Sequence, residues 1–169
     1  MVNIELNKQA KLSPHFTLGE VCKTSVKSLD GNIPSREVIE NLKRLCPWLE
    51  ELRYSYNTLY CLKPGEDYET SKNVEPIIIT SGYRSPDVNR AVGGAYSSNH
   101  LTGCAVDIRC AGVEQAIRYA AILLDTADDT KEEFDELLIE RNSKGHYWVH
   151  FAVRPPKEGN RRRVMIIRG

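Results

Sequence analysis

Three polar residues have the side-chain types that zinc prefers, and each stands where a polar group needs an explanation. His100 lies in a polar, turn-like segment, Asp107 interrupts the apolar run Ala-Val-Asp-Ile, and His150 interrupts Tyr-Trp-Val-His-Phe-Ala-Val. A carboxylate in an apolar strand is costly unless it is paired or binds a metal. Two imidazoles and one carboxylate leave a fourth zinc position open, as hydrolysis requires. The residues alone leave a structural alternative, in which the histidines are satisfied core residues and the aspartate caps a turn.

The segment that carries His100 must fold back so that this histidine meets Asp107. Residues 98–103 have the composition of a turn, and residues 105–108 have that of a strand. Gly103 between them permits a tight reversal that a side chain would hinder. We therefore expect Asp107 to project from its strand toward His100.

Hydrophobic spacing and turn residues predict the elements that position these side chains. Helices are expected over residues 17–22, 34–58, 85–92 and 113–126. Strands are expected over residues 76–80, 105–108, 134–140, 147–153 and 163–168, with a polar hairpin loop over 141–146. Helices come first and most strands follow, so the predicted fold class is α+β, a small, mainly antiparallel sheet with helices packed on it.

The two longer helices are predicted to be amphipathic. The first has an apolar face made by Val38, Leu42, Leu45, Leu49 and Leu52. The last has an apolar face made by Val113, Ala116, Ile117, Ala120 and Leu124. Pro47 lies inside the first helix and is expected to kink it or to begin a second one.

Length and composition fit an ordinary globular chain. The 169 residues are 41% hydrophobic and 27% charged, and 23 basic residues balance 23 acidic ones. We expect one domain over residues 1–169, with an irregular lead-in over 1–14. A net charge of zero gives no electrostatic reason to expect binding to nucleic acid or to a membrane.

Cysteines and a short basic run are given structural interpretations. The five cysteines are expected to be reduced and mostly buried, since their number is odd and no Cys-x-x-Cys pair occurs among Cys22, Cys46, Cys61, Cys104 and Cys110. Arg161-Arg162-Arg163 is expected to be a solvated strand start, with contact to an anionic polymer as the alternative.

The segment around His100 resembles the zinc-ligand signature of peptidase family M15. It reads Ser-x-His-x-x-Gly-x-Ala-x-Asp from Ser98 to Asp107. Residues 79–85, 89–94 and 148–150 resemble other elements of that family, and residues 12–18 resemble the start of its phage and prophage-like branch. The resemblance therefore extends over nearly the whole chain and implies a fold like that of Hedgehog and the D-Ala-D-Ala peptidases.

The resemblance implies a function and roles for named residues. His100, Asp107 and His150 are expected to bind zinc, which is the expected cofactor. Arg84 is expected to stabilise an oxyanion or to bind a substrate carboxylate. Ser98 is expected to hydrogen-bond the substrate or to steady the turn that carries His100. The implied activity is hydrolysis of D-amino-acid-containing peptide bonds in peptidoglycan stem peptides, by a carboxypeptidase or an endopeptidase.

The general base is where this chain departs from many M15 relatives, which carry an acidic residue three positions before the second histidine. Tyr147 occupies that position here. Glu140 is the expected substitute, because pairing it opposite Trp148 would make it a diagonal neighbour of His150, roughly 5.5–8 Å away.

Four other residues are weighed for the same site. His146 is a second candidate for the base or for a transition-state donor, and an exposed loop position is its structural alternative. Asp135 and Glu136 lie further back along the strand and are weaker candidates, and His15 is interpreted as structural.

The expected partner is a peptidoglycan stem peptide, bound by a monomer. No run is apolar enough to cross a membrane, and the N-terminus lacks a secretion signal. We therefore expect synthesis in the cytoplasm, with action on the cell wall after release or export. Two further functions remain open: a zinc-containing module that binds cell-wall peptide without cutting it, and a structural protein whose metal site stabilises the fold.

Overall fold

Five strands form one open sheet in the order β1-β2-β4-β3-β5. The computed structural model, which describes residues 7–168, has these strands at Ile79–Ser81 (β1), Ala105–Cys110 (β2), Glu136–Arg141 (β3), Tyr147–Ala152 (β4) and Arg163–Arg168 (β5). Every neighbouring pair is antiparallel except β3 and β5, which run parallel. The predicted α+β class with a small, mainly antiparallel sheet is confirmed.

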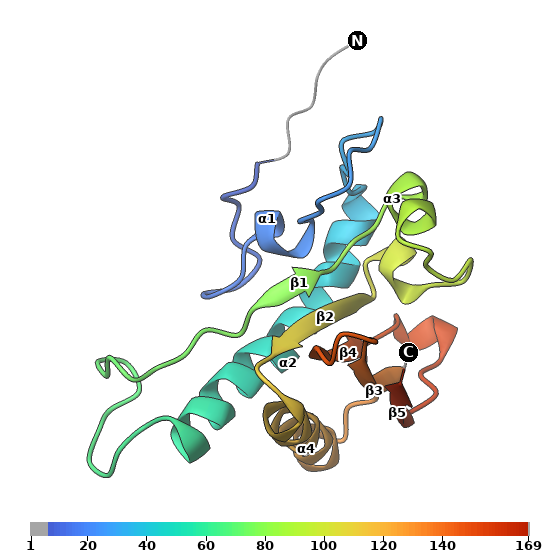
Figure 1. Ribbon diagram of the computed structural model, residues 1–169. Helices are drawn as coiled ribbons and strands as arrows, with labels where there is room; N and C mark the ends of the chain where they lie inside the picture. The colour runs from blue at the N-terminus through green and yellow to red at the C-terminus, as the bar shows by residue number, and fades with distance from the viewer. Residues whose placement is uncertain (1–6, 169) are drawn as a thin grey trace.

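Two helices precede the first strand, and the other helices lie between later strands along the chain (Figure 1). The α-helices are Leu18–Val21 (α1), Arg36–Tyr60 (α2), Pro86–Ala91 (α3) and Val113–Thr130 (α4), and the 3-10 helices are Asn99–Thr102 (η1) and Pro156–Glu158 (η2). Capping residues determine where several of these helices begin. The Thr17 side chain caps α1 in a capping box with Glu20, and Ser85 caps α3 before a proline.

The helix α2 continues through Pro47, so the option of a second helix beginning there is excluded. Proline lacks the N–H that would bond one turn back, and tertiary contacts must therefore support this region. Trp48 and Leu49 directly after it are buried, and the Trp48 ring packs on Phe151 of β4 at 5.2 Å between centroids. Burial of these side chains holds the helix together across the proline.

The core lies between one face of the sheet and the pair of helices α2 and α4 (Figure 1). The predicted face of α2 is confirmed for its four leucines, while Val38 is partly buried. The predicted face of α4 is wrong in part, because Val113 and Ile117 are 47% and 53% exposed. The buried stripe of α4 instead runs through Ala116, Tyr119, Ala120, Leu123 and Ala127. Small alanines let this stripe approach the sheet and α2, and the bulkier flank faces solvent.

Several predicted boundaries differ from the observed ones. The strand expected over 76–80 is shorter and later, because only Ile79–Ser81 pairs with β2, and this pairing contains a register shift. The hairpin strands and loop are confirmed to within two residues, and the last strand is confirmed at 163–168. Residues 7–14 of the predicted lead-in form no helix or strand, and residues 1–6 lie outside the described residues.

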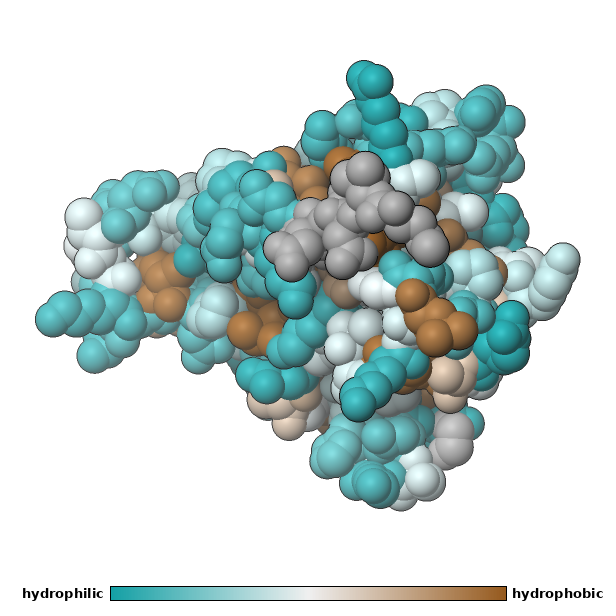
Figure 2. Space-filling model, turned by 90° about the horizontal axis from the view of Figure 1, so that it is seen from above, coloured by the Kyte–Doolittle hydropathy of each residue, from teal (hydrophilic) through white to brown (hydrophobic). Residues whose placement is uncertain are grey.

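The surface seen from above is mostly hydrophilic, with apolar side chains in small separate groups (Figure 2). Within residues 7–168, no helix is long and apolar enough to span a membrane. The cysteines are unpaired and all but Cys61 are buried, as predicted.

The basic run is exposed and leads into β5, as predicted for a solvated strand start. Arg161, Arg162 and Arg163 each pair with a carboxylate of another segment, because β5 brings them beside β3 and the end of α4.

Gly103 shows how closely the His100 turn approaches α2. It ends η1 with φ +71°, and a Cβ added there would lie 2.8 Å from the carbonyl oxygen and a side-chain carbon of Val38. Gly65 has a similar φ of +85° but nothing within 4 Å of an added Cβ. Substitutions at these two glycines therefore distinguish the cost of backbone strain, which both share, from the cost of steric contact, which only Gly103 has.

We predict that Gly103→Ala destabilises the protein more than Gly65→Ala does. The strained φ should cost roughly 1–2 kcal/mol in both variants, and overpacking against α2 should add roughly 1–3 kcal/mol at Gly103. Urea unfolding of the metal-free variants measures both costs. Equal costs would mean that the turn does not depend on this close approach.

Candidate metal centre

His100 is held by the short turn η1, with its ring orientation fixed from behind. The Ser98 hydroxyl accepts a hydrogen bond from the His100 backbone N–H at 3.3 Å, so Ser98 steadies this turn. The His100 Nδ1–H donates to the Gly82 carbonyl at 2.6 Å, which leaves Nε2 free toward Asp107. A histidine held in one tautomer by such a bond is prepared to bind a metal through its other nitrogen.

Gly82 can provide that carbonyl because it lies against the backbone of α1. A Cβ at Gly82 would meet the Val21 carbonyl oxygen at 2.2 Å, so only glycine fits there. The adjacent loop is fixed by the buried Asn32, whose side-chain amide donates to the Tyr83 carbonyl at 3.1 Å and accepts from the Ser85 N–H at 2.7 Å. The loop that carries Arg84 is therefore rigidly placed beside His100.

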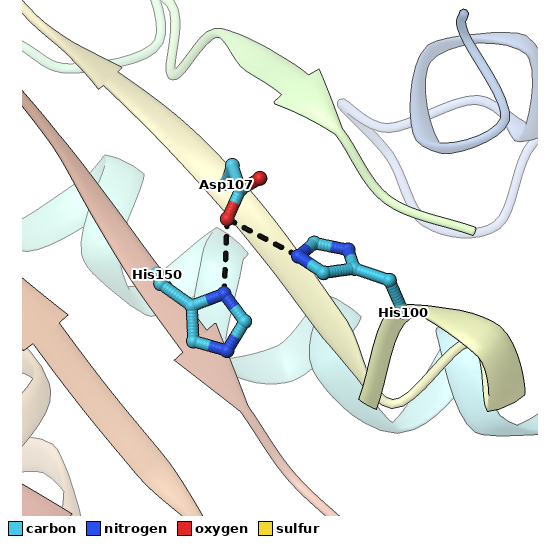
Figure 3. Close-up of side chains that lie close together, drawn as sticks. All are labelled: His100, Asp107 and His150. Atoms are coloured by element: carbon cyan, nitrogen blue, oxygen red, sulfur yellow. Dashed lines mark hydrogen bonds and ion pairs between the residues drawn. The ribbon is translucent and has the colours of Figure 1, made fainter. Parts of the chain in front are cut away.

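Asp107 and His150 meet because β2 and β4 place them directly opposite each other. Asp107 Oδ1 lies 2.9 Å from His150 Nδ1 and 3.2 Å from His100 Nε2, and the three side chains converge (Figure 3). Each of the three residues is at most 8% exposed. One donor atom from each lies within 4.8 Å of the others, so these residues could hold a metal ion.

The charges in this cluster are strongly coupled. Burial alone would raise the pKa of Asp107, but His100 and His150 hold it well below its usual range. Burial alone would lower the pKa of His150, but hydrogen bonds to Asp107 and Glu136 raise it to about 9. Asp107 is thus an ionised carboxylate, the form that binds metals, while His150 must lose a proton before it can act as a ligand.

Arg84 forms an ion pair with the second oxygen of Asp107. Its Nη2 bonds Asp107 Oδ2, and its Nε donates to the Ser81 hydroxyl at 2.7 Å. Arg84 is therefore in the predicted site, with most of its guanidinium committed to a candidate ligand. Its predicted role with an oxyanion or a substrate carboxylate stays a prediction.

Glu136 contacts the cluster more closely than its sequence position suggested. Its Oε2 lies 3.4 Å from His150 Nε2, and the Asn99 amide donates to the same oxygen at 3.0 Å. Arg161 and Arg163 approach its other oxygen at 2.9 and 3.3 Å. Glu136 was a weaker candidate in the sequence, and it lies on the diagonal from His150 opposite to that of Glu140.

Asp135 anchors this outer network from a fully buried position. It accepts two hydrogen bonds from the Arg161 guanidinium, at 2.8 and 2.6 Å, and one from Asn99 at 2.8 Å. Burial alone would raise the pKa of Asp135, but these bonds lower it. Asp135 therefore has a structural role beside the cluster.

Glu140 lies where the hairpin register was predicted to put it. It pairs opposite Trp148, and Leu138 pairs opposite His150, so Glu140 and Glu136 flank His150 diagonally on one face. Burial, and then the charge of Asp107, raise the pKa of Glu140. Glu140 thus belongs to the electrostatic environment of the cluster, with a pKa moved toward neutrality.

His146 is exposed at the end of the hairpin loop, beside a cavity that Asp107 also lines. His146 is thus both an exposed loop residue and a neighbour of the candidate site, so both interpretations made from the sequence still apply to it. His15 has a structural role outside the cluster, since its ring pairs with Glu50 of α2 at 2.6 Å.

Comparison with known proteins gives one family match. Residues 66–145 match the family model described as Peptidase M15, and this region includes Arg84, His100, Asp107 and Glu140. The match covers slightly less than half of the chain and supports an assignment to peptidase family M15. It likewise supports a peptidase function. No curated protein sequence matches the chain.

The donor set fits zinc, the metal on which peptidase family M15 depends. Two imidazole nitrogens and one carboxylate oxygen are ligands that zinc binds, and three of them leave a coordination position free. Each ligand also has a partner behind it: Gly82 for His100, Arg84 for Asp107 and Glu136 for His150. Such partners are typical of built metal sites.

We predict that Glu136→Gln weakens zinc binding by about 10- to 100-fold, because a neutral amide orients and polarises His150 less well than a carboxylate. Glu132→Gln, which removes an exposed charge outside the cluster, should leave zinc binding unchanged. Competition with a zinc-binding dye at fixed pH measures both affinities. Unaltered zinc affinity in the Glu136 variant would show that this contact does not support the ligand.

Proposed function

We propose that the protein is a zinc metallopeptidase that hydrolyses D-amino-acid-containing peptide bonds in peptidoglycan stem peptides. The observation that carries this proposal is the buried cluster of His100, Asp107 and His150 in a chain that matches family M15. The bond cut is the terminal one for a carboxypeptidase or an internal one for an endopeptidase.

His100, Asp107 and His150 would hold the zinc ion. When bound, zinc supplies Lewis-acid polarisation of the peptide carbonyl and lowers the pKa of water at the site. Burial of all three ligands supports this proposal, because low surrounding polarity strengthens each electrostatic interaction with the reacting groups.

Glu140 is the proposed general base. Its raised pKa suits proton transfer near neutral pH better than that of an ordinary surface carboxyl. In this proposal, a Glu140 oxygen takes a proton from the attacking water and returns it to the leaving amine. His146 at the cavity rim is the alternative residue for one of these transfers.

Arg84 is the proposed electrostatic stabiliser. Its Nε and Nη2 are committed to Ser81 and Asp107, and these bonds fix the plane of the guanidinium. The remaining Nη1 makes no hydrogen bond within residues 7–168, so it can donate to the oxygen that becomes negative during attack.

A non-catalytic module that binds cell-wall peptide is the second candidate. It is favoured by Tyr147, which occupies the position where many M15 relatives carry an acidic residue. Turnover of a stem peptide separates the two functions, because a binding module would retain the peptide intact.

We predict that the zinc-loaded protein cleaves a synthetic stem pentapeptide and that Glu140→Gln lowers kcat by about 10²- to 10⁴-fold. The variant should retain zinc, because Glu140 is not a proposed ligand. Liquid chromatography of the products identifies the bond cut, and metal analysis gives the zinc content. Wild-type activity in the zinc-loaded variant would contradict the role of Glu140.

Folding provides the control for this variant. A carboxyl whose pKa is raised in the folded state binds its proton more tightly there, so its contribution to stability falls as pH rises past the usual value of 4.5. Glu140→Gln removes that unfavourable charge. The metal-free variant should therefore have a Tm at least as high as the wild type at pH 7, and lost activity cannot then be attributed to unfolding.

A further inference from the structure

Arg109 lies on the same face of β2 as Asp107, two residues further along the strand. Alternate residues of a strand point to the same face, about 7 Å apart over two positions. Ile108 between them is fully buried in the core, whereas Arg109 is exposed on the opposite face. Arg109 therefore extends the surface that carries the metal cluster.

Asp107 and Arg109 lie at the same cavity, which has a volume of about 400 Å³. Asp107 and Arg109 both line it, together with Thr80, His146, Tyr147 and Trp148. Trp148 is the cross-strand partner of Arg109, and Tyr147 and Trp148 are both partly buried. Such walls reduce the water around a charged group and strengthen its interaction with an ion of opposite sign.

The guanidinium of Arg109 makes no hydrogen bond or ion pair with any residue between 7 and 168. Other arginines near the cluster have carboxylate partners: Arg84 pairs with Asp107, Arg154 with Asp135, and Arg163 with Glu136. An arginine fork matches the geometry of a carboxylate. Arg109 thus presents a free carboxylate-binding group in a cavity that opens onto the candidate metal centre.

We propose that Arg109 binds a substrate carboxylate located one residue from the scissile bond. This inference rests on the proposed peptidase function and deepens it by naming what the substrate must carry. Arg84 is committed to Asp107, so it is less able to serve the same carboxylate.

Two carboxylates of stem peptides have this chemistry. One is the C-terminal carboxylate of a D-Ala-D-Ala peptide, and the other is the α-carboxylate of D-Glu in an L-Ala-D-Glu peptide. Both present the same planar anion close to a peptide bond, and the experiment distinguishes them.

The test uses two matched pairs of synthetic peptides with the zinc-loaded protein. In the first pair, the D-Ala-D-Ala peptide carries a free or an amidated C-terminus. In the second pair, the L-Ala-D-Glu peptide carries a free or an amidated α-carboxyl. Binding is measured by calorimetry and hydrolysis by chromatography, for the wild type, Arg109→Gln, Arg109→Lys and the control Arg44→Gln, which alters an exposed α2 arginine outside the cavity.

We expect the wild type to prefer the free carboxylate of one pair by about 10- to 100-fold in Kd and in kcat/KM. The pair that shows the preference identifies the source. Arg109→Gln should abolish this preference, mainly by raising KM for the free-carboxylate peptide, and Arg109→Lys should restore part of it. Arg44→Gln should retain the full preference.

An unchanged preference in Arg109→Gln, or no preference in the wild type, would overturn the assignment of Arg109. Failure of the proposed function has a different signature. In that case no peptide is hydrolysed, and binding alone decides whether Arg109 recognises the carboxylate.

Discussion

One buried carboxylate, Asp107, holds the candidate site together. Its two oxygens contact three basic side chains that come from separate parts of the chain: His100 from a turn, His150 from β4 and Arg84 from a loop. An isolated carboxylate at this depth would be neutralised, because desolvation of its charge is too costly. The neighbouring charges keep it ionised, and the same ionised oxygens are what a divalent metal requires. The turn, the loop and β4 together place these three basic side chains around Asp107 of β2.

A second layer of polar residues fixes the first. Asn99 donates to Asp135 and Glu136 from the turn that carries His100, so the turn is tied to β3. Glu136 in turn contacts His150, and Arg161, two residues before β5, pairs with both Asp135 and Glu136. The outer network therefore couples the two histidine-bearing segments through side chains that never contact the metal position. Buried polar networks of this kind are stabilising only when every member is satisfied.

The parts of the fold that local signals control could be predicted from sequence. Ser85 caps α3 and a capping box begins α1. The polar loop between two apolar runs indicated the hairpin, and the pairing of Glu140 with Trp148 that was considered for it is the observed one. The sequence could not tell whether the stripe that contains Val113 or the one that contains Tyr119 is the buried side of α4. Both stripes have helical spacing, and only packing against the sheet distinguishes them. The role of Glu136 was missed for a similar reason. Its anchors come from β5, whose parallel pairing with β3 is a long-range contact that leaves no local signal.

The metal content of the purified protein tests the central claim most directly. Elemental analysis should find about one zinc per chain in the wild type and in His15→Ala, since His15 pairs with Glu50 outside the cluster. His100→Ala should lose the metal, because it removes one of three ligands. A wild-type chain that neither carries zinc nor binds it on addition would contradict the assignment of His100, Asp107 and His150 as a metal centre, and so would zinc retained in full by His100→Ala.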